Sequence, residues 1–160
     1  MSQNKSKVSW KSRMLVGISA IVIFLITLVL LQVDNWSRDF SENHAETAAD
    51  AKDPLLRPQV LSVPIEKAET TVRETARQIP RWEFAERKTW DNGQVWLYYT
   101  RKTLVFRFVD DVIIKLIPTN DDSTTIELES QSRIGKGDLG QNPRNIKEFV
   151  RALATDESAR

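Results

Sequence analysis

The hydrophobic pattern of the chain begins with one long apolar run. Residues 14–33 read MLVGISAIVIFLITLVLLQV and contain no charged side chain. About 20 apolar residues in a helix are enough to cross the hydrocarbon core of a membrane, which is about 30 Å thick. A cleaved signal peptide is the alternative, but its apolar region is usually shorter, at about 7–15 residues, and ends at small residues. The run therefore predicts an uncleaved transmembrane helix.

The charges on either side of this run predict its orientation. Basic residues precede it, and mostly acidic residues follow it within residues 34–53. Because positively charged flanks stay in the cytoplasm, residues 1–13 are expected to form a basic cytoplasmic tail. The rest of the chain would then lie beyond a bacterial inner membrane, in the periplasm or an equivalent extracytoplasmic space. The basic residues are Lys5, Lys7, Lys11 and Arg13.

A polar and acidic segment, residues 34–54, follows the apolar run. It has few of the large apolar side chains that are needed to bury a core, so we interpret it as a linker. It contains His44, the single histidine of the chain, which we expect to be solvated. A globular domain is expected over residues 55–154, followed by a short tail, residues 155–160.

Two helical patterns enclose a series of strand patterns in this domain. Residues 64–79 and 142–153 each carry apolar residues on one helical face, and Asn142 and Pro143 suit the start of the second helix. Residues 81–100 predict a hairpin around Asn92 and Gly93, since both residue types tolerate positive φ. A further strand is expected over residues 111–117, and residues 124–133 alternate strictly. The helical faces are Ile65, Ala68, Val72, Ala76 and Ile79, and Ile146, Phe149, Val150 and Leu153.

This order of elements predicts a small α+β domain. We expect an antiparallel sheet of about four strands with two helices packed on one face. The formal net charge is +1 and the domain has no basic stripe, which argues against nucleic-acid binding. The chain has no cysteine, which excludes disulfides, thiol catalysis and thiolate metal sites. Neither a catalytic metal nor a cofactor is expected.

Residues 135–140 (GKGDLG) match the G-x-G-x-x-G spacing of dinucleotide-binding loops. That loop normally follows a strand, leads directly into a helix, and is completed by a second strand and an acidic residue about 20 positions later. Here residues 141–143 precede the expected helical face, and no strand pattern follows that helix. We therefore reject a dinucleotide-binding function for this loop.

Two segments around this loop resemble the domain of unknown function 1499 family. Residues 108–112 read FVDDV and residues 132–144 read SRIGKGDLGQNPR. The resemblance is close over the last third of the chain and looser from Leu61 onward. Because the family has no established activity, the resemblance supports the fold more than a function. The matching residues of the second segment are Ser132, Arg133, Gly135, Asp138, Gly140, Asn142 and Arg144.

The glycine-rich loop has two interpretations. In the structural one, Gly135 and Gly140 take positive φ, and Asp138 accepts backbone hydrogen bonds or pairs with Arg133 or Arg144. In the other, nearby cations hold a phosphate, a carboxylate or a lipid head group beside the start of the last helix. We favour the structural interpretation, with a supporting pair between Asp138 and Arg133. The cations are Arg133, Lys136 and Arg144.

Asp110 and Asp111 are the remaining candidates. Adjacent strand residues point to opposite faces, so these carboxylates are not expected to converge on one proton or metal, and one of them can pair with Arg133. We expect a membrane-anchored protein whose domain binds a partner protein or an anionic small molecule near the glycine-rich loop. The alternative is an enzyme that uses Asp110 or Asp111, Asp138 and nearby arginines. Since no nucleophile–base pair is visible, we favour binding.

Overall fold

The computed structural model describes residues 9–30, 43–103, 108–134 and 140–158. Its first helix, α1 (Trp10–Leu30), contains most of the predicted transmembrane run. Over Trp10–Thr27 the mean hydropathy is 1.6, and none of this window is buried against the rest of the protein. By length and composition, α1 is therefore able to cross a membrane.

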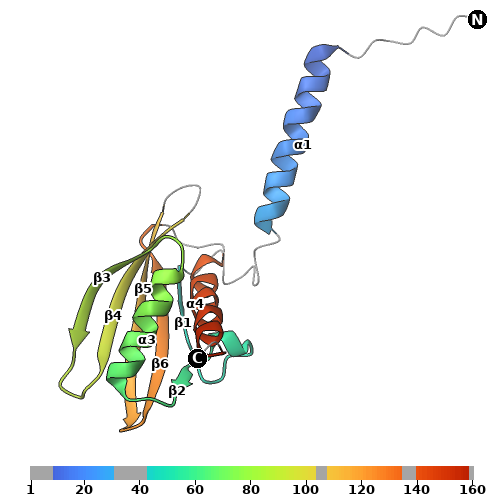
Figure 1. Ribbon diagram of the computed structural model, residues 1–160. Helices are drawn as coiled ribbons and strands as arrows, with labels where there is room; N and C mark the ends of the chain where they lie inside the picture. The colour runs from blue at the N-terminus through green and yellow to red at the C-terminus, as the bar shows by residue number, and fades with distance from the viewer. Residues whose placement is uncertain (1–8, 31–42, 104–107, 135–139, 159–160) are drawn as a thin grey trace, which may run out of the picture.

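The domain is built on one antiparallel sheet of six strands, in the order β1-β6-β5-β4-β3 (Figure 1). Strands β3 to β6 follow one another in the sequence and pair with their sequence neighbours. The short strands β1 and β2 pair with successive parts of the other edge of β6. The strands are β1 (His44–Glu46), β2 (Gln59–Leu61), β3 (Trp82–Thr89), β4 (Val95–Lys102), β5 (Val109–Asn120) and β6 (Ser123–Ser132).

The sheet has two more strands than the sequence pattern predicts. Strand β1 lies inside the segment that we interpret as a linker, and it pairs His44 with Gln131. His44 also has a side-chain partner, because its Nε2 lies 3.2 Å from Glu129 Oε1. Strands of three residues are too short to show an alternating pattern, so β1 and β2 are recognised only by their backbone pairing with β6.

The predicted hairpin of residues 81–100 is formed by β3 and β4. Trp90 N donates to Gln94 O at 2.9 Å, and Gly93 N donates to Trp90 O at 2.9 Å. Gly93 has a φ of 80°, whereas Asn92 is not among the residues with positive φ. The turn is thus a type I turn followed by one left-handed glycine, and not the two-residue turn that Asn-Gly often makes.

Two helices, α3 (Ile65–Gln78) and α4 (Gln141–Ser158), cover the same face of the sheet (Figure 1). This arrangement confirms the predicted α+β layers. The predicted apolar faces are buried, with Val72 and Phe149 both fully inaccessible. A short 3-10 helix, η1 (Pro54–Leu56), connects β1 to β2. The strand residues buried beneath the helices are Val95, Leu97, Tyr99, Val112, Ile114, Leu116, Ile126 and Leu128.

The opposite face of the sheet is not covered by either helix. It carries Trp96 and Tyr98 of β4, and each aromatic ring lies beneath a lysine ammonium group. Lys115 Nζ is 4.9 Å from the centre of the Trp96 ring, and Lys88 Nζ is 4.9 Å from the centre of the Tyr98 ring. These contacts cover part of the apolar surface that the open face would otherwise expose.

Candidate functional site

A cluster of polar side chains is buried between the start of α4 and the adjoining ends of β5 and β6. We call these residues the polar cluster. Strict alternation along both strands turns the cluster residues toward the helices, and the first turns of α4 supply the rest. Asp110 is only 1% exposed, although it carries a carboxylate. The polar cluster consists of Asp110, Ser130, Ser132, Asn142 and Asn145.

Both carboxylate oxygens of Asp110 accept hydrogen bonds. Ser132 Oγ donates to Oδ1 at 2.7 Å, and Asn145 Nδ2 donates to Oδ2 at 3.0 Å. Arg101 is the register partner of Asp110 on β4 and points to the same covered face. Its guanidinium is 2.9 Å from Glu148 Oε2 on α4. The hydrogen bonds from Ser132 and Asn145 offset part of the high cost of burying the Asp110 carboxylate away from water.

Asn142 and Asn145 complete the polar cluster. Asn142 Oδ1 accepts from Ser130 Oγ at 2.7 Å, and Asn142 Nδ2 donates to the backbone oxygen of Asn43 at 2.7 Å. Asn145 Nδ2 also donates to Ser130 Oγ at 3.0 Å, and Asn145 Oδ1 accepts from Gln141 Nε2 at 2.7 Å. The cluster therefore ties the start of α4 to β6 and to the residue before β1, and its polar atoms are engaged within the protein.

The start of α4 differs from the sequence prediction. The helix begins at Gln141, and the side chain of Asn142 lies in the polar cluster instead of capping the helix. Gly140 precedes the helix with a φ of 74°, and its carbonyl oxygen accepts from Arg144 N at 3.3 Å. The expectation of positive φ at Gly140 is confirmed. The asparagine was misassigned because a good N-cap residue is also a good partner for buried polar groups.

Asp110 and Asp111 diverge to opposite faces of the sheet, as predicted. Asp111 forms two hydrogen bonds with the Arg133 guanidinium, Nε to Oδ2 at 2.9 Å and Nη2 to Oδ1 at 2.7 Å. These bonds raise the pKa of Arg133 above its usual range. Because Asp110 is buried and Asp111 is paired on the other face, the two carboxylates cannot act on one bound atom.

The centre of the glycine-rich loop lies outside the described residues. No structure is therefore given for residues 135–139, which include Gly135, Lys136 and Asp138. The proposed pair between Asp138 and Arg133 stays a prediction. At the end of the loop, Arg144 Nη2 donates to Gln141 Oε1 at 3.4 Å.

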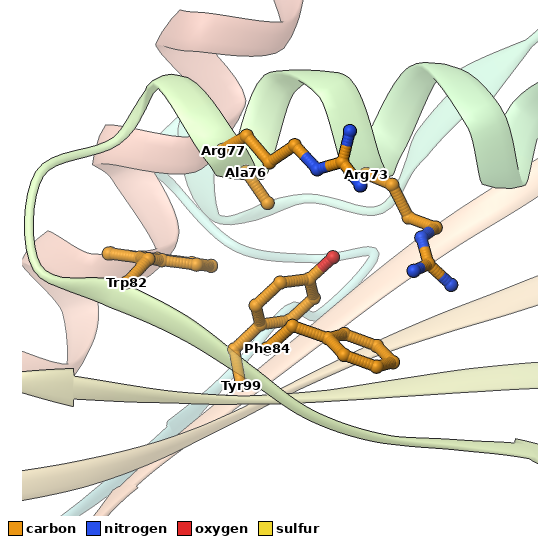
Figure 2. A pocket seen from close by; sticks show the side chains of 6 residues that line it. All are labelled: Arg73, Ala76, Arg77, Trp82, Phe84 and Tyr99. Atoms are coloured by element: carbon orange, nitrogen blue, oxygen red, sulfur yellow. The ribbon is translucent and has the colours of Figure 1, made fainter.

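A hollow of about 130 Å³ lies between α3 and the hairpin of β3 and β4 (Figure 2). Figure 2 shows the Tyr99 hydroxyl directed toward α3 and toward the guanidinium groups of Arg73 and Arg77. This site could not be predicted from the sequence, because its residues come from three elements. The signal available in the sequence was the spacing of Arg73 and Arg77, which puts both on one side of a helix. The lining residues are Arg73, Ala76, Arg77, Trp82, Phe84 and Tyr99.

Arg73 is positioned over an aromatic wall of the hollow. Its Cζ lies 4.5 Å from the centre of the Phe84 ring. Its Nη1 is 3.6 Å from Glu69 Oε1, but Glu69 is bound more closely by Arg87, whose Nε and Nη2 donate to the two oxygens at 2.8 and 3.0 Å. Arg73 is therefore held in place without a short hydrogen bond to Glu69.

Other donors of the hollow have no hydrogen-bond partner among the residues that the structure describes. They are the guanidinium of Arg77 and the hydroxyl of Tyr99; the Nε1 of Trp82 also has no partner among the described residues, but this atom is buried. Burial raises the pKa of the Tyr99 phenol, although Arg73 and Arg77 act in the opposite direction. The hydroxyl is thus protonated near neutral pH and able to donate. The hollow combines cations and neutral donors, and no carboxylate lines it.

Comparison with known proteins identifies the family. The family described as "Protein of unknown function (DUF1499)" matches residues 37–153. The chain belongs to this family. No curated protein matches the chain. A solution NMR structure of a protein from Thermobifida fusca is similar at 12% sequence identity, over 70% of this chain and 91% of that chain, with a TM-score of 0.41.

The polar cluster accounts for much of the motif by which the sequence resembles the DUF1499 family. Asp110, Ser132 and Asn142 belong to both, and Asp111 and Arg133 form the ion pair beside the cluster. In this DUF1499 domain these motif residues hold α4, β5 and β6 together. The residues of the hollow lie outside the two motif segments, so the hollow is a feature of a different part of the domain.

Proposed function

We propose that this protein is a single-pass membrane protein that presents its α+β domain outside the cytoplasm and binds a small anionic molecule there. The anchor is α1, which is apolar over Trp10–Thr27 and has no buried side chain in that window. The orientation follows from the basic residues before the apolar run and the acidic residues after it. The match to the family begins at residue 37, beyond the anchor.

The observation that carries the binding proposal is the hollow beside α3. The guanidinium groups of Arg73 and Arg77 and the hydroxyl of Tyr99 adjoin one space (Figure 2). Guanidinium groups form strong, charge-assisted hydrogen bonds with carboxylates and phosphates. The rings of Trp82 and Phe84 offer apolar contact to the rest of a ligand, as aromatic walls do in most small-molecule sites.

We favour the hollow for anion binding over the two described cations of the glycine-rich loop. Arg133 forms two hydrogen bonds with Asp111, and Arg144 donates to Gln141. An enzymatic role for Asp110 has no comparable support, because both of its oxygens accept hydrogen bonds from the protein and it is buried.

Titration of the full-length protein with phenyl phosphate in a mild detergent tests the proposal. Binding is followed by tryptophan fluorescence, since Trp82 lines the hollow. Arg77→Gln should weaken binding about tenfold, because a hydrogen bond to a charged group contributes about 1.5–3 kcal/mol. Arg151→Gln removes the same charge from an exposed position on α4 and should leave the affinity unchanged. Equal affinities for wild type and Arg77→Gln would refute the proposed site.

A further inference from the structure

The hollow and the start of the domain lie at the same end of the sheet. Ser132 N donates to Asn43 O, so the chain enters the domain beside the last residue of β6. Ser132 pairs with Asp110, Asp110 pairs with Arg101, and Arg101 pairs with Trp82 in the hollow. These residues form one row across the sheet. Four strand spacings separate β1 from β3, which is about 19 Å.

This row puts the hollow within reach of the membrane that α1 is able to span. Only residues 31–42 connect α1 to Asn43. A fully extended segment of that length spans at most about 43 Å, so the end of the domain that carries the hollow can reach the lipid surface.

The donors of the hollow suit a phosphate group better than a carboxylate. Arg73, Arg77 and Tyr99 supply separate donors from two elements, and a phosphate offers more acceptor oxygens than the two of a carboxylate. Phe84 is 46% exposed, so the apolar wall of the hollow reaches the protein surface. A phosphate carried on an apolar body can therefore contact both parts of the site.

One further cation, Arg81, lies next to Trp82 at this end of the domain. Arg81 is exposed, and its Nε donates to the carbonyl oxygen of Lys102 at 3.2 Å. The side chain of Lys102 points to the opposite face of the sheet, where it pairs with Glu83 at 2.7 Å. Exposed arginine and lysine side chains attract anionic lipid surfaces over a Debye length.

We infer that the hollow binds the phosphate of an anionic phospholipid head group from the membrane in which α1 is anchored. This inference rests on the proposed function, and it names the source of the anion. The arginines bind the phosphate, the Tyr99 hydroxyl adds a donor, and Trp82 and Phe84 contact the glycerol and the first acyl carbons. The connection of 12 residues to α1 allows the site to reach the lipid surface.

Native mass spectrometry of the full chain in detergent micelles tests this inference by measuring bound lipid. Phosphatidylglycerol is compared with phosphatidylcholine, which has the same apolar body but a neutralised phosphate, and with glycerol 3-phosphate, which has no apolar body. We expect phosphatidylglycerol to bind at least about tenfold more tightly than either of the other two. Arg77→Gln should remove most of that difference, and Arg151→Gln should preserve it. Both variants keep the basic tail before α1, so lipid bound by that tail contributes equally.

The outcomes separate the inference from the proposed function. Arg77-dependent binding of glycerol 3-phosphate as tight as that of phosphatidylglycerol would overturn the lipid source and leave anion binding in place. Phosphatidylglycerol binding that is the same in wild type and Arg77→Gln would also overturn the inference. The third outcome is that Arg77→Gln binds phenyl phosphate, glycerol 3-phosphate and phosphatidylglycerol as tightly as the wild type does. This result would overturn the proposed function as well.

Discussion

The side-chain amide of Asn145 donates a hydrogen bond to the buried carboxylate of Asp110 across 3.0 Å. This bond joins the second turn of α4 to β5, and Asn145 also donates to Ser130 on β6. A helix and two strands thus meet at one amide group. This hydrogen bond helps to stabilise the Asp110 carboxylate in the core. The described residues contain no cluster of side chains that could hold a metal ion.

Asn145→Ala should lower the free energy of unfolding by about 3 kcal/mol. The substitution leaves Asp110 Oδ2 buried without its donor, and a buried charged group that loses its partner carries the full desolvation penalty. Urea unfolding followed by circular dichroism measures the change. Thr155→Ala, at an exposed position on the same helix, should change stability by less than about 0.5 kcal/mol. A similar small change for Asn145→Ala would mean that the polar cluster contributes little to stability.

Phe149→Ala should destabilise the domain by about 3–5 kcal/mol, because it removes a fully buried ring from the core. Phe149 stacks on Trp82 with ring centres 5.8 Å apart, so the loss should also shift the tryptophan emission. Arg151→Ala, on the exposed face of α4, is the control and should have little effect. Equal thermal shifts for the two variants would show that the packed face of α4 is wrongly assigned.

Stability should fall below about pH 4 because of Glu129. Burial raises its pKa, but hydrogen bonds from Lys115 at 2.9 Å and His44 at 3.2 Å outweigh burial, and the pKa is lowered overall. A carboxylate with a lowered pKa stabilises the folded state above its unfolded pKa, which is about 4.3, and this stabilisation is lost as pH falls through the folded pKa.

Glu129→Gln tests this linkage by urea unfolding at a series of pH values. The variant should be less stable than wild type near neutral pH and should lose less stability on acidification below about pH 4. Glu127→Gln is the matched control, since Glu127 lies on the same face of β6. If Glu129→Gln and wild type show parallel pH profiles, the ion pairs of Glu129 do not contribute to the acid sensitivity.

Gly140→Ala should destabilise the domain by about 1–2 kcal/mol, because the backbone at this position has a φ of 74°. Gly140→Asn should cost less, since asparagine enters the left-handed region more readily than alanine. Thermal unfolding measures the stability of the two variants and shows which substitution costs more. An alanine variant as stable as the asparagine variant would show that the start of α4 adjusts to a different conformation.

A reporter enzyme that is active only outside the cytoplasm should be active when fused after Arg160. Replacing the basic residues before the apolar run with neutral ones should reduce that activity, because these charges set the orientation. A full-length fusion that is produced but shows no reporter activity would contradict the proposed topology. N-terminal sequencing of the mature protein provides the second measurement, and a terminus after Val33 would show that the run is a cleaved signal peptide.

Local periodicity accounts for the features that were predictable. The apolar spacing of residues 64–79 and 142–153 indicated both domain helices, and strict alternation indicated the inner face of β6. The opposite directions of Asp110 and Asp111 also followed, because adjacent residues of a strand always point to opposite faces. Such features depend only on the geometry of one element, so a single segment of sequence contains them.

The remaining features depend on contacts between distant segments, and only the tertiary structure decided them. Strand β1 exists because its backbone pairs with β6, and Asn142 is a buried partner of Ser130 and Asn43 because the sheet and α4 meet there. The hollow forms where α3 packs over the hairpin of β3 and β4. This packing places Arg77 of α3 and Tyr99 of β4 at the same hollow. The periodicity of one segment does not predict these tertiary contacts, since each contact depends on the free energy of packing elements that are far apart in the chain.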